Sequence, residues 1–203
     1  PYYLFPDESV TRWLADAESE ACIRARLIHE AEDEDVCVIP LEGGASTYPL
    51  HPSLYEIDHI SYRPSSSTTR APVRLTSTEE LDRTVRDWRD LTGTPEYAIQ
   101  SDQSIRFVPR PVNAGEILLE GYRIPLKSLI TAAKPEINSI HHRHLVHWAL
   151  HRAFSTPDPE ILDMGRADAA ERAFTEYFGK RPDVDLRRKV REDEVQTNKV
   201  FWA

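Results

Sequence analysis

A run of histidines in the last third of the chain has the residue types and spacing best suited to chemistry. His144, His147 and His151 are spaced three and four positions apart. On a helix, this spacing places the three imidazoles on one face, which is compatible with a metal site. The zinc-protease pattern also needs a glutamate directly after its first histidine, and this run contains none. No cysteine pair lies nearby to complete a closed site.

The same histidines have a second interpretation. They alternate with apolar residues such as Leu145 and Trp148, and histidines in such positions more often pack and hydrogen-bond in a half-buried setting. We therefore expect no metal, no cofactor and no catalytic residue. A small metal-dependent hydrolase using His144, His147 and His151 stays as the alternative function.

Other signatures of enzymes are missing from the sequence. There is no G-x-S-x-G elbow for a nucleophilic serine, and neither Cys22 nor Cys37 lies in a reactive-cysteine motif. The Gly43-Gly44 pair follows no phosphate-binding or dinucleotide-binding pattern and reads as a turn. The sequence predicts a protein that is not an enzyme.

The last 21 residues, which we call the C-terminal segment (residues 183–203), combine dense charge with terminal aromatic residues. Acidic residues flank its basic run and no aromatic residue interleaves it, so it is a weak nucleic-acid signal. Its low apolar content predicts that it cannot fold alone, but aromatic anchors and arginines allow such a segment to order on a partner. A solvated, self-compensating segment is the alternative. The residues expected to bind such a partner are Arg187, Arg188, Lys189, Arg191, Val200, Phe201 and Trp202.

Hydrophobic periodicity predicts the elements in the first two thirds of the chain. A helix is expected from about Asp7, as its N-cap, to Ala31. A further helix is expected to begin at Ser77, whose capping box includes Glu80, and to end at Gly93. Short strands are expected around it, at residues 36–40, 54–62, 72–75, 96–100, 104–108 and 116–123, with the last three forming an antiparallel meander.

The last third of the chain returns to helical periodicity. One helix is expected to open at Pro135, and a second is expected to follow Asp158 as its N-cap, with Pro159 in its first turn. Gly179 should end that helix, whose buried side is predicted to contain Ala167, Ala170, Phe174 and Phe178.

This order of elements predicts an α+β fold, a helical bundle with an inserted antiparallel β-rich domain and an extended C-terminal tail. Residues 1–35 and 125–182 would form the helical body. Residues 36–124 would form the β-rich insertion with its one helix, and residues 183–203 an extended docking tail.

Composition limits the classes of partner. The chain has 203 residues, of which 40% are hydrophobic, and its formal net charge is −9. An acidic balance argues against a non-specific grip on DNA or anionic lipid. No apolar stretch approaches the roughly 18 residues of a membrane span, so we expect no membrane partner. Two cysteines are too few for a disulfide framework, which favours an intracellular origin.

The middle of the chain contains a series of short phrases. TGTPEYAI at residues 92–99 follows Trp88, IRFVPRP occupies 105–111, and RIP at 123–125 leads into the last helices. In this order the phrases resemble the head-to-tail adaptor proteins of tailed bacteriophages, also called connector or head-completion proteins, and in particular the short-tailed phage type. The resemblance covers about residues 8–180.

The resemblance implies a structural virion protein. Proteins of that family form a dodecameric ring under the portal, extend the DNA channel and provide the platform for tail attachment. It implies that the helical part forms the ring body and that the β-rich part faces neighbours or the tail. The expected partners are other copies of the chain, the portal protein and a downstream tail or nozzle protein, while packaged DNA passes without specific binding. The expected location is the head–tail interface of the virion, and the host cytoplasm during assembly.

Overall fold

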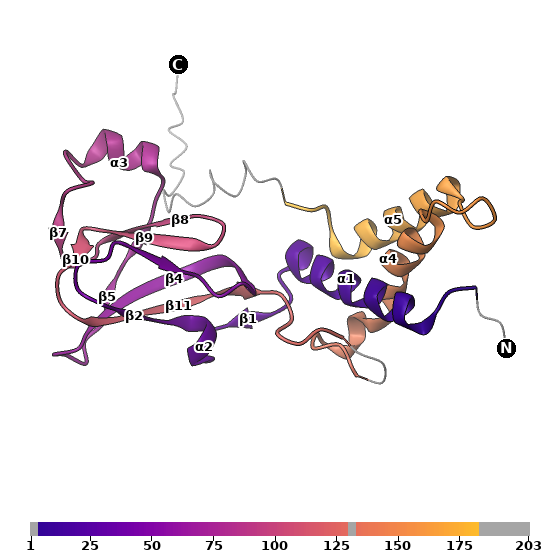
Figure 1. The fold of residues 1–203 in the computed structure, drawn as a ribbon, viewed down its shortest axis with the longest axis horizontal. Coiled ribbons are helices and arrows are strands. Elements are labelled where there is room, and N and C mark those ends of the chain that lie inside the picture. The colour runs from indigo at the N-terminus through magenta and orange to yellow at the C-terminus, as the bar shows by residue number, and fades with distance from the viewer. Residues whose placement is uncertain (1–3, 130–132, 183–203) are drawn as a thin grey trace, which may run out of the picture.

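The chain is described by a computed structural model that covers residues 4–129 and 133–182. Helices and strands occupy different ends of the molecule: α1, α4 and α5 lie at one end, and the strands, with α2 and α3, lie at the other (Figure 1). The mixed α+β class predicted from the sequence is confirmed. The C-terminal segment, with every partner-binding residue predicted in it, lies outside the described residues.

Three helices form the helical part: α1 (Asp7–Ala25), α4 (His142–Phe154) and α5 (Met164–Phe178), with a short 3-10 helix, η1 (Ser139–His141), before α4. Alanines on α1 allow the helices to approach closely, and Ala17 and Ala21 are completely buried. They pack in one cluster with Leu145, Phe174 and Phe178. The predicted buried face of α5 is confirmed, because its four expected core residues are the four that are buried.

The predicted end of the first helix was wrong. Its N-cap is Pro6 rather than Asp7, and Pro6 has no side-chain cap. The helix ends at Ala25 because Arg26 adopts a left-handed backbone (φ 51°), and the Arg26 N–H closes the last turn on the Cys22 carbonyl. The residues that follow form strand β1 (His29–Glu30).

The starts of the last two helices also differ from the prediction. The segment from Pro135 is not helical, and α4 begins only at His142. Asp158 caps a tight turn, in which its backbone carbonyl accepts from the Leu162 N–H. The N-cap of α5 is instead Asp163, whose carboxylate accepts from the Arg166 N–H at 3.0 Å. Gly179 ends α5 as predicted.

The strands form two main sheets. The five-stranded sheet has the order β1-β11-β4-β5, and β2 also pairs with β11. The four-stranded sheet has the order β3-β9-β8-β6. Two further short strands pair in parallel away from both sheets. The bounds are β2 (Val38–Leu41), β3 (Thr47–Pro49), β4 (Leu54–Pro64), β5 (Ala71–Pro72), β6 (Arg74–Leu75), β7 (Thr92–Gly93), β8 (Tyr97–Gln100), β9 (Ser104–Val108), β10 (Arg110–Pro111) and β11 (Gly115–Arg123).

The predicted meander is correct for two of its three strands. β8 and β9 pair antiparallel, but β11 pairs with β4, β2 and β1 in the other sheet. Alternation on β9 is confirmed, because Ile105 and Phe107 are buried in the core. Buried side chains of both sheets, including Ile60 and Ile117, form one cluster with them. The sheets therefore share a single core.

Two other predicted elements are shorter or different. Residues 34–37 form a helical turn, α2 (Glu34–Cys37), and Cys37 lies in that turn. The strand predicted to start at residue 36 therefore starts at Val38. Ser77 caps α3 (Thr78–Thr84) as predicted, and its hydroxyl accepts from the Glu80 N–H at 3.2 Å. The predicted continuation of α3 to Gly93 was wrong, because Val85 is already extended.

A glycine at the centre of the large sheet gives the first testable prediction. At Gly121 a Cβ atom would lie 2.2 Å from the Glu56 carbonyl oxygen, at a register shift between β11 and β4. We expect Gly121→Ala to lower the free energy of unfolding by about 1–3 kcal/mol, because the backbone of β4 would have to move. Urea denaturation measures this loss.

The matched control is Gly165→Ala, in the first turn of α5, where the nearest heavy atom lies 3.4 Å from the added Cβ. Alanine favours a helix over glycine, so this change should be neutral or stabilising by up to about 1 kcal/mol. Equal effects of the two substitutions would contradict the close approach at Gly121.

Candidate functional site

Two histidines of the alternative metal site, His144 and His151, pack between α4 and α5. The imidazole of His144 stacks on the Tyr177 ring, with centroids 3.5 Å apart and planes 8° from parallel. Desolvation, with Arg143 and neighbouring histidines, lowers the pKa of His144. The His151 ring nitrogen Nδ1 donates to the Ala167 carbonyl at 3.1 Å. These contacts fit the packing interpretation of the histidines.

The histidine alternative gains no support from geometry. Within residues 4–129 and 133–182, no group of three His, Cys, Asp or Glu residues is arranged to hold a metal ion. The two thiols are equally unsuited to nucleophilic attack. Burial raises the pKa of Cys22 to about 12 and that of Cys37 to about 11, which keeps both protonated at neutral pH.

The RIP phrase at the end of β11 belongs to a polar network between the helical part and the large sheet. Arg123 is 6% exposed. Its Nε donates to Glu30 of β1 at 2.9 Å, and its Nη2 donates to Glu136 at 2.6 Å. The buried carboxylate of Glu18 on α1 accepts the backbone N–H groups of Glu136 and Ile137 at 2.5 and 3.2 Å.

The charges of Arg123, Glu30 and Glu136 stabilise one another. Burial acts against the charged form of Glu30, but hydrogen bonds from Arg123 and three backbone N–H groups lower its pKa to about 2. Burial also opposes ionisation of Glu136, and Arg123 again prevails to lower its pKa. Burial of Glu18 raises its pKa, although two backbone N–H groups bind it. We call Arg123, Glu30, Glu136 and Glu18 the junction network.

Two further contacts join the same two parts. The Tyr55 hydroxyl on β4 donates to the Cys22 carbonyl of α1 at 2.7 Å. Arg26 makes two hydrogen bonds to Glu56 of β4, at 3.1 and 2.6 Å. The junction is thus built from charged and polar groups of elements far apart in sequence, which local patterns do not reveal.

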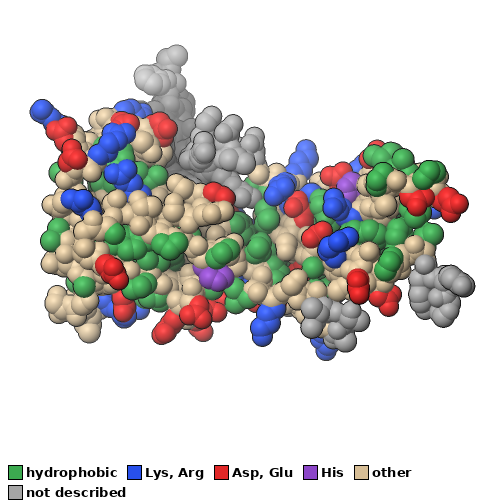
Figure 2. Space-filling model, in the orientation of Figure 1, with side chains coloured by type: hydrophobic (Ala, Val, Ile, Leu, Met, Phe, Trp, Pro, Cys, Tyr) green, Lys and Arg blue, Asp and Glu red, His purple; other side chains and the backbone are tan. Residues whose placement is uncertain are grey.

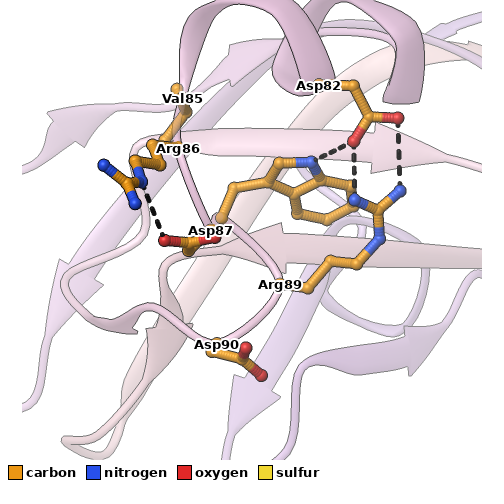
Figure 3. A pocket seen from close by; sticks show the side chains of 7 residues that line it. Asp82, Val85, Arg86, Asp87, Arg89 and Asp90 are labelled. Carbon is orange, nitrogen blue, oxygen red and sulfur yellow. Dashed lines mark hydrogen bonds and ion pairs between the residues drawn. The ribbon is translucent and has the colours of Figure 1, made fainter.

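The TGTPEYAI phrase follows a second polar cluster, centred on Trp88. Figure 3 shows Asp82 and Arg89 of this cluster bonded to each other. The Trp88 ring is 3% exposed, and its Nε1 donates to Asp82 at 2.8 Å. Asp82 also accepts two hydrogen bonds from Arg89, and these bonds lower its pKa. The Arg89 and Arg106 guanidiniums lie 4.3 and 4.9 Å from the ring centroid. Trp88 lies beyond the end of α3, where it anchors the loop over the four-stranded sheet.

A cavity of about 350 Å³ borders this cluster and is lined by Asp82 and residues 85–90. The charges around it are largely paired within the loop, since Arg86 also contacts Asp87 at 3.3 Å. Asp87 has a left-handed backbone (φ 50°) that turns the loop. The arrangement holds Trp88 in place.

Exposed hydrophobic side chains gather in the helical part of the molecule. Val146 and Leu150 lie one turn apart on α4 and are 46% and 40% exposed. The space-filling view shows hydrophobic side chains among charged ones over this part (Figure 2). Exposed apolar groups in a cluster mark contact surfaces. The large exposed hydrophobic residues there are Leu4, Val10, Ile140, Val146, Leu150, Leu162, Met164 and Tyr177.

The comparison with family models gives the class of protein: the model of the SU10 adaptor protein matches residues 3–198. The chain therefore belongs to the SU10 adaptor protein family, a family of phage head-to-tail adaptors that are structural proteins. A search of curated proteins gave no match. None of the helices in the described part of the chain is long and apolar enough to span a membrane.

Proposed function

We propose that this protein is the head-to-tail adaptor of a phage virion, in which copies form a ring, with twelve members as the expected number, under the portal. The ring extends the DNA channel and provides the platform for the tail or nozzle protein. Membership of the adaptor family over residues 3–198 is the observation that carries this proposal.

In this proposal the helical body, residues 1–35 and 125–182, forms the wall of the ring. The concentration of exposed hydrophobic side chains on the helices supports this assignment, because neighbouring copies would cover them. Contacts repeated head-to-tail close into a ring without a two-fold patch. The β-rich insertion, residues 36–124, would then face neighbours or the tail.

The C-terminal segment is proposed to dock on the portal or on a neighbouring copy. Phe201 and Trp202, with Val200, would anchor it, and the basic run of Arg187, Arg188, Lys189 and Arg191 would form charge pairs. The net charge of −9 supports a channel along which DNA slides, because an acidic surface does not hold the duplex.

Native mass spectrometry of this protein mixed with the portal ring of its own phage tests the proposal. We expect binding to saturate at one copy per portal subunit. A portal that stays bare at high excess of the protein would overturn the adaptor role.

Loss of the two terminal aromatic residues tests the docking segment within the same assay. We expect Phe201→Ala/Trp202→Ala to weaken portal binding by at least about tenfold, because buried aromatic anchors carry most of the binding energy of an interface. Val112→Ala, at an exposed residue of the β-rich part, is the control and should bind normally. Undiminished binding of the double variant would remove the segment from the portal contact while leaving the adaptor role intact.

A further inference from the structure

A cleft of about 350 Å³ lies at the outer end of the helical part, between the start of α1 and the end of α4. We call it the α1–α4 cleft. Trp13 forms part of its wall, is 9% exposed, and meets the Phe5 ring edge-to-face at 5.0 Å. The lining residues are Phe5, Ser9, Arg12, Trp13, Arg152, Ser155, Thr156 and Pro157.

The cleft contains two cations that lack a counter-charge. Arg12 comes from α1 and Arg152 from α4, and both are exposed. Within residues 4–129 and 133–182, neither guanidinium has an ion pair or a hydrogen bond. By contrast, Arg24, further along α1, binds Glu20 at 2.8 Å.

The hydroxyl groups at the edge of the cleft are partly engaged. Ser155 Oγ donates to the His151 carbonyl at 2.7 Å, and Thr156 Oγ1 donates to the Arg152 carbonyl at 3.2 Å. These bonds satisfy carbonyl groups at the end of α4, and the two arginines are the charged residues of the lining. Two guanidiniums beside an aromatic wall suit carboxylate side chains, which arginine binds with two parallel hydrogen bonds.

The last described residues contact α1 at Glu20, about two turns from Arg12. Arg12, Asp16 and Glu20 are spaced four positions apart and so lie on one stripe of the helix. At the end of this stripe, Arg181 Nε lies 3.9 Å from Glu20 Oε2. The segment that follows α5 thus contacts this face of α1 through Arg181 and Glu20.

Beyond Arg181, the order of charges along the chain is opposite in sign to the order of Asp16 and Arg12 along α1. The basic run at 187–191 comes first, and the acidic triplet at 192–194 follows. On the α1 stripe, Asp16 comes first and Arg12 follows. From Glu20 to Arg12 the helix rises about 12 Å, whereas the ten residues 183–192 span up to about 33 Å when extended. The reach is sufficient within one molecule.

We propose that the acidic triplet, residues 192–194, binds the α1–α4 cleft of the same molecule through Arg12 and Arg152, with the basic run passing Asp16. The inference concerns the isolated chain and does not depend on a ring or a portal. It assigns a binding site to two arginines that otherwise have no partner among the described residues.

Limited proteolysis of the purified full chain tests this site. A glutamate-specific protease cuts after Glu192 and Glu194, and mass spectrometry measures the rate at those two bonds. We expect Arg12→Gln/Arg152→Gln to raise the rate by about fivefold or more, because two charge-assisted contacts are lost. Raising the salt concentration to about 0.5 M should do the same to the wild-type chain and leave the double variant unaffected.

The control is Arg172→Gln, which removes an exposed arginine of α5 outside the cleft and should leave the rate unchanged. Thermal unfolding of each variant checks that the helical part stays folded. Equal rates in the wild-type chain and the double variant would overturn the proposal. Protection that grows with protein concentration would also overturn it, since the occupant would then be the segment of a second copy.

Discussion

Arg123→Leu is expected to lower the free energy of unfolding by about 3 kcal/mol, since it leaves the largely buried carboxylate of Glu30 and the partly exposed one of Glu136 without their cation. Arg123 is 6% exposed and binds Glu30 and Glu136 at 2.9 and 2.6 Å. Leucine keeps an apolar volume similar to that of the aliphatic part of arginine but has no hydrogen-bond donor. The loss of unfolding free energy therefore reports the missing guanidinium charge. Urea denaturation followed by circular dichroism at neutral pH measures the change.

The control for this substitution is Arg63→Leu, which removes the ion pair with Glu116 on the same sheet. Those side chains are 38% and 41% exposed, so solvent screens the pair and the expected cost is below about 1 kcal/mol. A loss at Arg123 no larger than the loss at Arg63 would contradict a buried junction network.

Acid titration of the wild-type chain and of Arg123→Leu shows how the stabilisation by Glu30 depends on pH. The pKa of Glu30 is about 2 in the folded protein, below its usual value of 4.5. A lowered pKa stabilises the folded state above the unfolded-state value, and the stabilisation is lost as pH falls from about 4.5 toward 2. In Arg123→Leu this part of the acid dependence should become weaker. An unchanged acid profile would show that Arg123 does not hold Glu30 ionised.

The elements that sequence predicts best are those in which one local rule decides the outcome. The buried face of α5 follows from apolar residues at helical spacing, and Phe174 and Phe178 are buried as that spacing requires. Ser77 caps α3 because its hydroxyl needs only a backbone N–H three residues away. Alternation on β9 likewise depends only on the two faces of a strand.

Element ends depend on tertiary contacts, and there the sequence was misleading. Asp158 and Asp163 are both good N-caps by residue type. The N–H of Asp163 binds the carbonyl of Phe154 at 3.1 Å, which closes the loop between α4 and α5 and moves the helix start to Met164. No pattern within the loop itself predicts that bond.

Strand pairing failed for a similar reason. A short connection between residues 108 and 115 suggested that β11 pairs with β9, as in a meander. In the structure, β10 occupies that connection and pairs in parallel with β7, and β11 crosses into the other sheet. Pairing partners are chosen by the shared core, which includes Ile60 and Ile117, rather than by the length of the loop.

The candidate sites divide in the same way. The histidine spacing was visible, but whether the rings hold a metal or pack depends on partners such as Tyr177 of α5. Arg12 and Arg152 are 140 positions apart in the sequence, and only the pairing of α1 with α4 brings them to one cleft. The junction network also joins residues separated by up to 118 positions.

Phe174→Ala is expected to lower the free energy of unfolding by about 3–5 kcal/mol, because it removes a completely buried aromatic side chain of α5 and leaves a cavity. The Phe174 ring is completely buried and lies 4.6 Å from the Phe178 ring and 5.1 Å from the Trp148 ring, centroid to centroid. The Arg24 guanidinium lies 5.2 Å from the Phe174 ring, so a cation–π contact is lost too.

Urea denaturation measures this loss, and Leu150→Ala is the control at the same end of the molecule. Leu150 is 40% exposed, and its truncation should cost less than about 1 kcal/mol. Phe174→Leu should fall between the two, since it keeps apolar volume but not the ring stacking. If Phe174→Ala and Leu150→Ala had equal effects, the three helices would not be held together by the cluster around Phe174.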